Sequence, residues 1–273
     1  MKKLIVCFVL SAFIFTACSA PSEPQQSNAD AQQPQVTEEQ SVGNFTDEMK
    51  IPYAGNLDEE YGADSVERQG DHKDSPYFAN LDFYNMESTD TLTIIPQFKT
   101  QQQTSEWSCG ISSVVMVLEH YGLLGDWNET TLAEKRSNGL NEEATTLKDI
   151  VAIMEEVTGR ETESTYDHPG DEIYEYMTLD KIQEFLKNDQ PVIIGWNDWG
   201  GHWQVIIGYD TMGTETQSDD VIIVADSYDT TDHNQDGYGV YPAERFYYNW
   251  TMYDFFTENM GVDERDMLFC VLK

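Results

Sequence analysis

The sequence of 273 residues predicts an α+β fold, in which a helical first half packs on a mostly antiparallel sheet. Apolar residues recur at helical spacing between residues 109 and 188. Beyond residue 190, short runs rich in β-branched and aromatic residues are bounded by Gly, Asp and Asn, which is typical of strands. Because the two patterns occupy successive parts of the chain, we expect a functional site at the junction between them.

The first long helix is predicted to begin at Cys109. Five residues after it fall on one apolar helical face: Ile111, Val114, Val115, Leu118 and Tyr121. A strand is expected over residues 92–98, ahead of this helix. Further helices are expected over residues 130–137, 146–158 and 179–188. The helices therefore precede the main strands along the chain.

Four strands are predicted in the second half, over residues 191–196, 202–209, 221–226 and 267–272. A turn-rich segment separates the second strand from the third, so these two are expected to form a hairpin. A register centred on Thr214 would place His202 directly opposite Asp226. Directly opposed residues point to the same face with Cβ atoms about 4.5–5.5 Å apart, close enough for a carboxylate to hold an imidazole.

The N-terminus has the pattern of an export signal. Two lysines precede an apolar run over residues 4–15, which is too short to span a membrane. The small residues before Cys18 resemble the lipobox of bacterial lipoproteins, in which cleavage leaves the cysteine as a lipid-bearing N-terminus. We expect a signal peptide over residues 1–17 and a mature protein anchored by this lipid to a bacterial membrane, at the cell surface. A secretory signal cut near Ala20 is the alternative.

Composition divides the mature chain into three parts. Residues 18–44 are rich in Gln, Pro, Ser, Ala and Glu and lack the large apolar residues that a core needs, so they are expected to be a disordered tether. Residues 45–79 are acidic with scattered aromatics and form either a linker or an arm on the domain, and residues 45–76 could block the cleft as a pro-segment. Residues 80–273 have the length of one domain.

The formal net charge of −35 bears on the partners of the protein. So large a negative charge repels phosphate backbones, which argues against nucleic acid. We expect a monomer that contacts the membrane only through its lipid anchor. Solubility outside the cell is the ordinary interpretation of this acidity, and attraction of cationic peptides or calcium is the functional one.

Cys109 is the candidate nucleophile. It lies at the start of its helix, where unpaired backbone N–H groups favour an anion, and an imidazolium partner can lower the pKa of such a thiol into a range of about 3.5–7.5. Cys270 lies in the apolar run MLFCVL, which is typical of a buried thiol on a strand. Because a bond between these two cysteines would consume the nucleophile, we predict no structural disulfide.

His202 is the candidate partner of Cys109 among five histidines. Two glycines free the backbone before it and an apolar strand follows it, whereas the other histidines lie on a polar helix side or in acidic segments. His202 would pair with the thiolate and later protonate the leaving amine, while Asp226 would fix the tautomer of the imidazole. Gln103, six residues before Cys109, could donate to the developing oxyanion together with the Cys109 backbone N–H.

These pieces, in this order, resemble the papain-like cysteine peptidases, in the branch related to bacteriocin-leader-processing (double-glycine) peptidases. The matching segments are Gln103, CGISSVVMVLEHYG, GGHWQVIIGYD and VIIVADSYD, which together span about residues 100–229. The resemblance implies a papain-like fold, a peptide or protein substrate, and the four catalytic roles given above. We expect no required cofactor.

One loop has the spacing of a calcium site. The pattern D-x-N-x-D-G, in which alternate oxygens face one ion, is formed by Asp232, Asn234, Asp236 and Gly237. The carboxylate expected at the twelfth position is replaced by Ala243. An acidic surface turn is therefore the preferred interpretation, and structural calcium is the alternative.

The leading hypothesis is a surface-anchored thiol hydrolase that cleaves peptide bonds through an acyl-enzyme. The same triad serves acyl transfer to amines, so a transamidase or a cell-wall amidase is a second hypothesis. A third is a tethered lipoprotein that binds without catalysis. The aromatic run RFYYNWTMYDFF, over residues 245–256, could line a peptide cleft, although core packing is the preferred interpretation.

Overall fold

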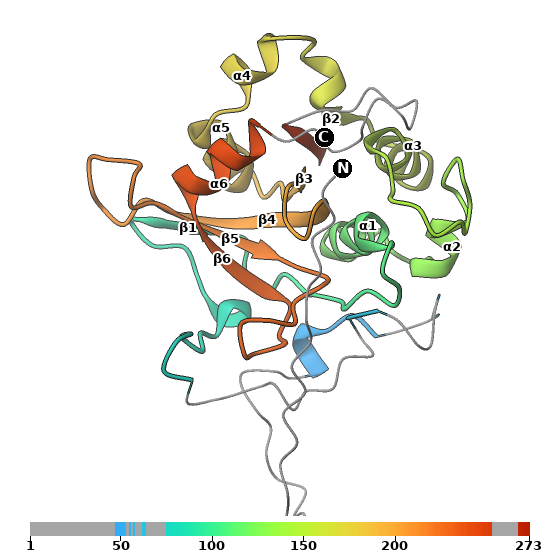
Figure 1. Cartoon of the computed structure of the whole chain (residues 1–273), viewed down its shortest axis with the longest axis horizontal. Coiled ribbons are helices and arrows are strands. Elements are labelled where there is room, and N and C mark those ends of the chain that lie inside the picture. The colour runs from blue at the N-terminus through green and yellow to red at the C-terminus, as the bar shows by residue number, and fades with distance from the viewer. Residues whose placement is uncertain (1–46, 53–54, 56, 58–61, 64–74, 253–266) are drawn as a thin grey trace, which may run out of the picture. The chain divides into compact units, whose positions relative to one another are not determined.

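A seven-stranded sheet forms the centre of the folded domain in the computed structural model (Figure 1). The structure describes residues 47–52, 55, 57, 62–63, 75–252 and 267–273. The predicted signal peptide and tether therefore lie outside the described residues. Within the described part of the chain, no helix has the length and apolar character needed to cross a membrane.

The strands are β1 Leu92–Ile94, β2 Thr162–Ser164, β3 Val192–Trp196, β4 His202–Asp210, β5 Val221–Ala225, β6 Tyr238–Pro242 and β7 Leu268–Leu272. They run in the order β2–β7–β3–β4–β5–β6, with β1 also paired to β4, and all these pairs are antiparallel. β3 pairs with the first half of β4 and β1 with its last residues, so β4 is central to the sheet. His202 begins this central strand.

The α-helices of the described residues are α1 Cys109–His120, α2 Glu129–Ala133, α3 Leu147–Thr158, α4 Glu172–Tyr176, α5 Leu179–Lys187 and α6 Ala243–Trp250. Short 3₁₀ helices lie at Asp47–Met49 (η1), Phe83–Asn85 (η4) and Thr165–Asp167 (η5). α1 packs on β4 and contacts α2 and α3 (Figure 1). Its first ten residues are all buried, so α1 is a core helix rather than a surface one.

The predicted α+β class is confirmed, and most elements lie where the sequence patterns indicate. Two elements are shorter than predicted by more than one residue. The strand expected over residues 92–98 ends at Ile94, because Pro96 has no N–H to donate and Gln97 has a φ of 55°. The helix expected over residues 130–137 ends at Ala133.

Four elements, β2, α4, β6 and α6, were not predicted from the sequence. β6 contains Gly and Pro, which weaken a strand pattern, and it lies at the edge of the sheet, where proline is tolerated. In α6, Phe246 and Trp250 are buried whereas Tyr248 is exposed. The core interpretation of the aromatic run therefore holds for Phe246 and Trp250, while residues 253–256 lie outside the described residues.

Part of the acidic segment over residues 45–79 packs on the domain. Met49 and Ile51 are buried, and backbone hydrogen bonds join the Met49 carbonyl and the Ile51 N–H to Thr100. Further along, the Ser75 hydroxyl lies 2.8 Å from Nδ1 of His233. The choice between a linker and an arm for the whole segment, and a pro-segment role, stay predictions.

Candidate active site

Cys109 is the first residue of α1, as the sequence predicts. Its side chain is buried, and both Cys109 and Cys270 are free thiols. The N-cap residue, Ser108, makes no side-chain hydrogen bond to the first turn. The backbone N–H groups of the first turn of α1 are therefore not capped by Ser108, and such uncapped groups favour a nearby negative charge.

Gly110 lets the start of α1 approach the sheet closely. A Cβ at this position would lie 2.8 Å from Thr145 Cβ and 3.1 Å from Trp203 Cδ1. Trp203 follows His202 on β4, and its indole N–H donates to the Thr145 carbonyl at 2.9 Å. The Cys-Gly pair thus brings the beginning of the helix into contact with the strand that carries the histidine.

The structure brings His202 and Asp226 together. His202 Nε2 lies 2.7 Å from Asp226 Oδ1, and both side chains are buried. The Cys109 side chain lies close enough to the same imidazole to raise its pKa. Because Nε2 is taken by the carboxylate, Nδ1 is the ring nitrogen left for the thiol.

The register predicted for this hairpin is wrong, although the two side chains do share a face. β4 and β5 pair Val205 with Ala225, and continuing that pairing places Asp226 opposite Gln204 rather than His202. A bulge further along β4 shifts the pairing once more. His202 and Asp226 are therefore diagonal neighbours, whose Cα atoms in a regular ladder lie about 7–8 Å apart, within reach of these longer side chains.

Two further groups, not predicted from the sequence, hold the Asp226 carboxylate. Gln204 Nε2 donates to Oδ2 at 2.8 Å, and the Tyr228 backbone N–H donates to Oδ1 at 2.7 Å. The Trp196 indole N–H donates to Gln204 Oε1 at 2.7 Å, which fixes the orientation of the amide. A signal for Gln204 was present, because it is a polar residue in an apolar strand and lies two residues after His202, on the same face.

Burial and ion pairing compete at the histidine and the aspartate. Burial lowers the pKa of His202 and raises that of Asp226, because it disfavours both charged forms. Their mutual attraction outweighs burial, with help from the Cys109 thiol at the imidazole. The net pKa of His202 is well above its usual 6.5, and that of Asp226 is below its usual 3.8. An imidazolium–carboxylate pair next to the sulfur is therefore favoured at neutral pH.

Gln103 is buried in the loop that leads to α1. Its side-chain oxygen accepts from the Ser227 hydroxyl at 2.8 Å, and its side-chain nitrogen donates to the Ser105 carbonyl at 2.7 Å. The Gln103 backbone N–H also donates to the Ser227 carbonyl at 2.8 Å. Because Ser227 follows Asp226, these bonds join the loop that contains Gln103 to the end of β5. The remaining N–H of the Gln103 amide is the one that an oxyanion role would use.

Glu129 is a buried carboxylate beneath this loop, and the sequence pattern did not single it out. It accepts from the Thr104 N–H at 3.0 Å, the Thr104 hydroxyl at 2.7 Å and the Ser112 hydroxyl at 3.1 Å. Burial raises the pKa of Glu129, and these donors oppose the rise. Glu129 therefore links Thr104, the residue after Gln103, to Ser112 of α1.

A buried cation also lies near the nucleophile. The Arg136 guanidinium donates to three carbonyl groups of the loop that follows α2, and it covers the Trp107 ring at 4.0 Å from the ring centroid. Burial lowers the pKa of Arg136, while the charges of Asp149, Glu143 and Cys109 act in the opposite direction. Arg136 lies beyond the end of α2, and its side chain organises the loop that follows. The sequence pattern had assigned it to a helix.

The predicted calcium loop bends at Gly237, which has a φ of 84°. The Asp232 and Asp236 carboxylates accept the backbone N–H groups of Asn234 and Tyr238, respectively. Asn234 Nδ2 also donates to Asp236 Oδ2 at 2.6 Å. Among the residues that the structure describes, no group of three His, Cys, Asp or Glu side chains could hold a metal ion. Structural calcium stays a prediction.

A thiol at a helix N-terminus, beside an imidazole that a carboxylate holds, is the arrangement of a cysteine peptidase site. On an α+β fold with a glutamine in the preceding loop, this arrangement is that of the papain-like class. The chain belongs to the Peptidase_C39 like family, whose sequence pattern matches residues 93–257. The matched region contains Gln103, Cys109, His202 and Asp226. The protein is therefore a cysteine peptidase, as the sequence predicts.

Two solved structures are similar to this chain. One is assigned as a C39-like peptidase from Bacillus anthracis; it is 15% identical, with a TM-score of 0.45 over 67% of this chain and 98% of that chain. The other is UfSP from C. elegans, which is 15% identical, with a TM-score of 0.43 over 76% of this chain and 41% of that chain. A comparison with curated proteins found no match.

Proposed function

We propose that the protein hydrolyses peptide bonds through an acyl-enzyme on Cys109. The observation that carries this proposal is the 2.7 Å contact between His202 Nε2 and Asp226 Oδ1, with Cys109 close enough to the same ring to raise its pKa. Asp226 holds the imidazole in one orientation and favours its charged form. The sulfur, the imidazole and the carboxylate thus have the order that nucleophilic catalysis by a thiolate requires.

The chemistry proceeds in two halves. The Cys109 thiolate adds to the scissile carbonyl carbon, and the charge that moves to the carbonyl oxygen is bound by the Cys109 backbone N–H and the Gln103 amide. The His202 imidazolium then gives its proton to the leaving nitrogen as the C–N bond breaks. Water attacks the resulting thioester while His202 takes one of its protons, which releases the acid and regenerates Cys109.

Digestion of a mixed peptide library by the mature protein, read by mass spectrometry, tests this proposal. Cys109→Ala should abolish every cleavage, and Cys270→Ala is the matched control because it removes the other buried thiol of the described domain. Cleavage by the Cys109→Ala protein, or none by the reduced wild type, would contradict the proposal. Adding a primary amine separates hydrolysis from transamidation, because a transferred acyl group appears as a new amide mass.

We also propose that this peptidase acts as a monomer at the outer face of a bacterial membrane, held there by a lipid on Cys18. The support is the export signal over residues 1–17 and the tether-like composition of residues 18–44. In detergent phase partitioning of expressing cells, the wild type should enter the detergent phase and Cys18→Ser the aqueous phase. Equal partitioning of the two proteins would refute the anchor.

A further inference from the structure

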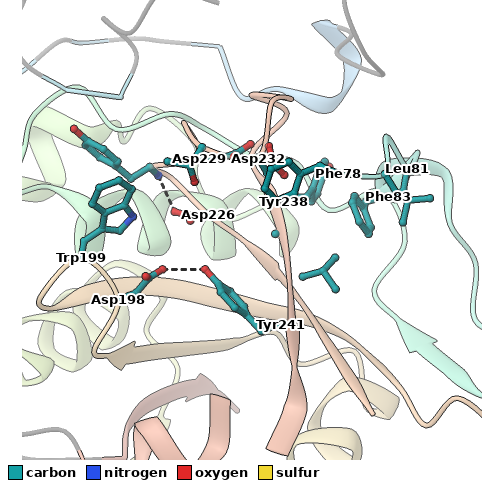
Figure 2. A pocket seen from close by; sticks show the side chains of 15 residues that line it. Phe78, Leu81, Phe83, Asp198, Trp199, Asp226, Asp229, Asp232, Tyr238 and Tyr241 are labelled. Atoms are coloured by element: carbon teal, nitrogen blue, oxygen red, sulfur yellow. Dashed lines mark hydrogen bonds between the residues drawn. The ribbon is translucent and has the colours of Figure 1, made fainter. Parts of the chain in front are cut away.

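A cavity of about 430 Å³ adjoins the active site (Figure 2). Ligand pockets in proteins range over about 300–1,000 Å³, so this cavity is large enough to take a side chain of a bound molecule. Asp226 lines the cavity and also bonds to His202. The cavity therefore begins where the catalytic imidazole is held, although neither Cys109 nor His202 is part of its lining.

The cavity is strongly acidic. Its lining includes the carboxylates of Asp198, Asp226, Asp229 and Asp232, and none of the described residues that line it is Lys, Arg or His. The wall therefore holds three carboxylates in addition to that of Asp226, which is paired with His202. Lys50 reaches the same loop, but it bonds to the Asp236 carbonyl and to Thr100 and is not part of the lining.

Asp229 is a buried carboxylate with one oxygen still open. Its side chain is more than nine-tenths buried, and Oδ2 accepts the Gly237 N–H at 2.8 Å, while Oδ1 has no hydrogen-bond donor among the described residues. Burial raises the pKa of Asp229 well above its usual 3.8, and the charges of Asp232, Asp226 and Asp236 raise it further. A positive charge in the cavity would bond to the open oxygen and relieve this repulsion.

Aromatic side chains form much of the remaining wall. Figure 2 shows Trp199 on one side of Asp226 and Phe78 and Phe83 on the other. Trp199 is 59% exposed and has a φ of 53°, a conformation that is uncommon for a bulky residue and is often found at functional sites. Its ring packs against that of Tyr228 at 5.4 Å between centroids. Aromatic faces beside carboxylates are the surroundings that stabilise an ammonium or a guanidinium group.

We propose that this cavity binds a lysine or arginine side chain of the substrate, on the leaving-group side of the scissile bond. The proposal rests on the proposed peptidase function. His202 has to protonate the departing nitrogen, and the cavity lies next to the carboxylate that holds His202, so the departing segment is the part of the substrate that extends toward it. The large negative charge of the chain would also attract cationic peptides.

Blocked peptides with arginine, lysine or citrulline at each position after the scissile bond test this assignment. Citrulline has nearly the shape of arginine but no charge. We expect kcat/KM for the arginine peptide to exceed that of the citrulline peptide by about ten- to a hundredfold. In Asp229→Asn, which keeps an oxygen for the Gly237 N–H, the ratio should fall toward one. Glu215→Gln removes one charge from the exposed turn between β4 and β5 and should keep the ratio unchanged.

Trp199→Ala provides a second variant that does not disturb a buried group, because Trp199 is largely exposed. It should lower the preference for arginine over citrulline by about two- to tenfold, since it removes one aromatic face. An arginine preference that survives both Asp229→Asn and Trp199→Ala would place the basic side chain elsewhere and overturn the proposal.

Calorimetry on the Cys109→Ala protein measures peptide binding without cleavage, so it tests the subsite independently of the peptidase reaction. Tighter binding of the arginine peptide than of the citrulline peptide, lost when Asp229→Asn is added, supports the subsite even if the wild type cleaves nothing. Cleavage by the wild type with no preference for a basic residue on the leaving side overturns the subsite and leaves the peptidase function intact. Stoichiometric calcium binding that blocks the arginine peptide also overturns it, because the cavity would then be a metal site.

Discussion

The domain contains two buried cysteines in contrasting surroundings. Cys270 lies on β7, paired with Ile193 and Ser164 of the neighbouring strands, and burial raises its pKa well above the usual 9.0. Cys109 is also buried, but it begins α1 and lies close enough to the His202 imidazole to raise its pKa. Burial alone keeps a thiol protonated and inert, whereas a helix N-terminus and an imidazolium favour the thiolate. The comparison teaches that the charged partner, rather than burial, makes a cysteine a nucleophile.

The largest expected effect comes from removing each thiol in turn. Cys109→Ala should lower kcat/KM by about 10⁴-fold or more, because no other group can form the acyl-enzyme. Cys270→Ala should retain nearly all activity, since Cys270 pairs with strands away from the site. Peptide hydrolysis under reducing conditions measures both. A comparable loss in Cys270→Ala would show that the contrast between the two thiols is false.

Asp226→Asn removes the group that does most to raise the pKa of His202 and should lower kcat by about 10³- to 10⁴-fold. Without the carboxylate, burial dominates and the imidazolium is lost at a lower pH. Because a neutral imidazole stabilises the thiolate less than an imidazolium does, Cys109 alkylation by iodoacetamide, followed against pH, should be slower in the variant than in the wild type around neutral pH. Cys270 supplies the internal control, because its slow alkylation should be the same in both proteins. Superimposable Cys109 profiles would mean that Asp226 does not act through His202.

Gln103→Ala should lower kcat by about a hundred- to a thousandfold with little change in KM, if the amide binds the oxyanion in the transition state. Gln101→Ala is the matched control, because Gln101 is a buried glutamine of the same loop. Steady-state kinetics on one peptide separates kcat from KM. A rise in KM alone would assign Gln103 to substrate binding instead.

The smallest effect concerns stability against pH. His202 has a raised pKa, so its contribution to the free energy of unfolding is complete below about 6.5 and is lost as the pH rises through its folded pKa. Asp226 has a lowered pKa, so its contribution is complete above about 3.8 and is lost as the pH falls through its folded pKa. The free energies of unfolding of the wild type and Asp226→Asn, measured with denaturant, should therefore differ most between about pH 3.8 and pH 6.5. A difference independent of pH would indicate that the pair is uncharged.

Local patterns were enough to place Cys109 at a helix start, His202 at the start of a strand and Asp226 at the end of the next one. Such patterns depend on residues a few positions apart, which the sequence displays directly. The pairing of β4 with β5 was predicted incorrectly, because a bulge and the packing of neighbouring strands set the register. Gln204 fills the position opposite Asp226 as a result, and it holds the carboxylate that His202 reaches diagonally.

By itself the sequence determined the order of the main helices and strands, the chemical types at the site and the strongly acidic charge. Only the tertiary structure decided which buried groups surround the nucleophile, such as Glu129 and Arg136, and that Asp226 and Asp229 share the wall of a cavity. The physical reason is that these contacts join segments far apart in the chain. Their geometry follows from how the helices and the sheet pack, which no local spacing of residues encodes.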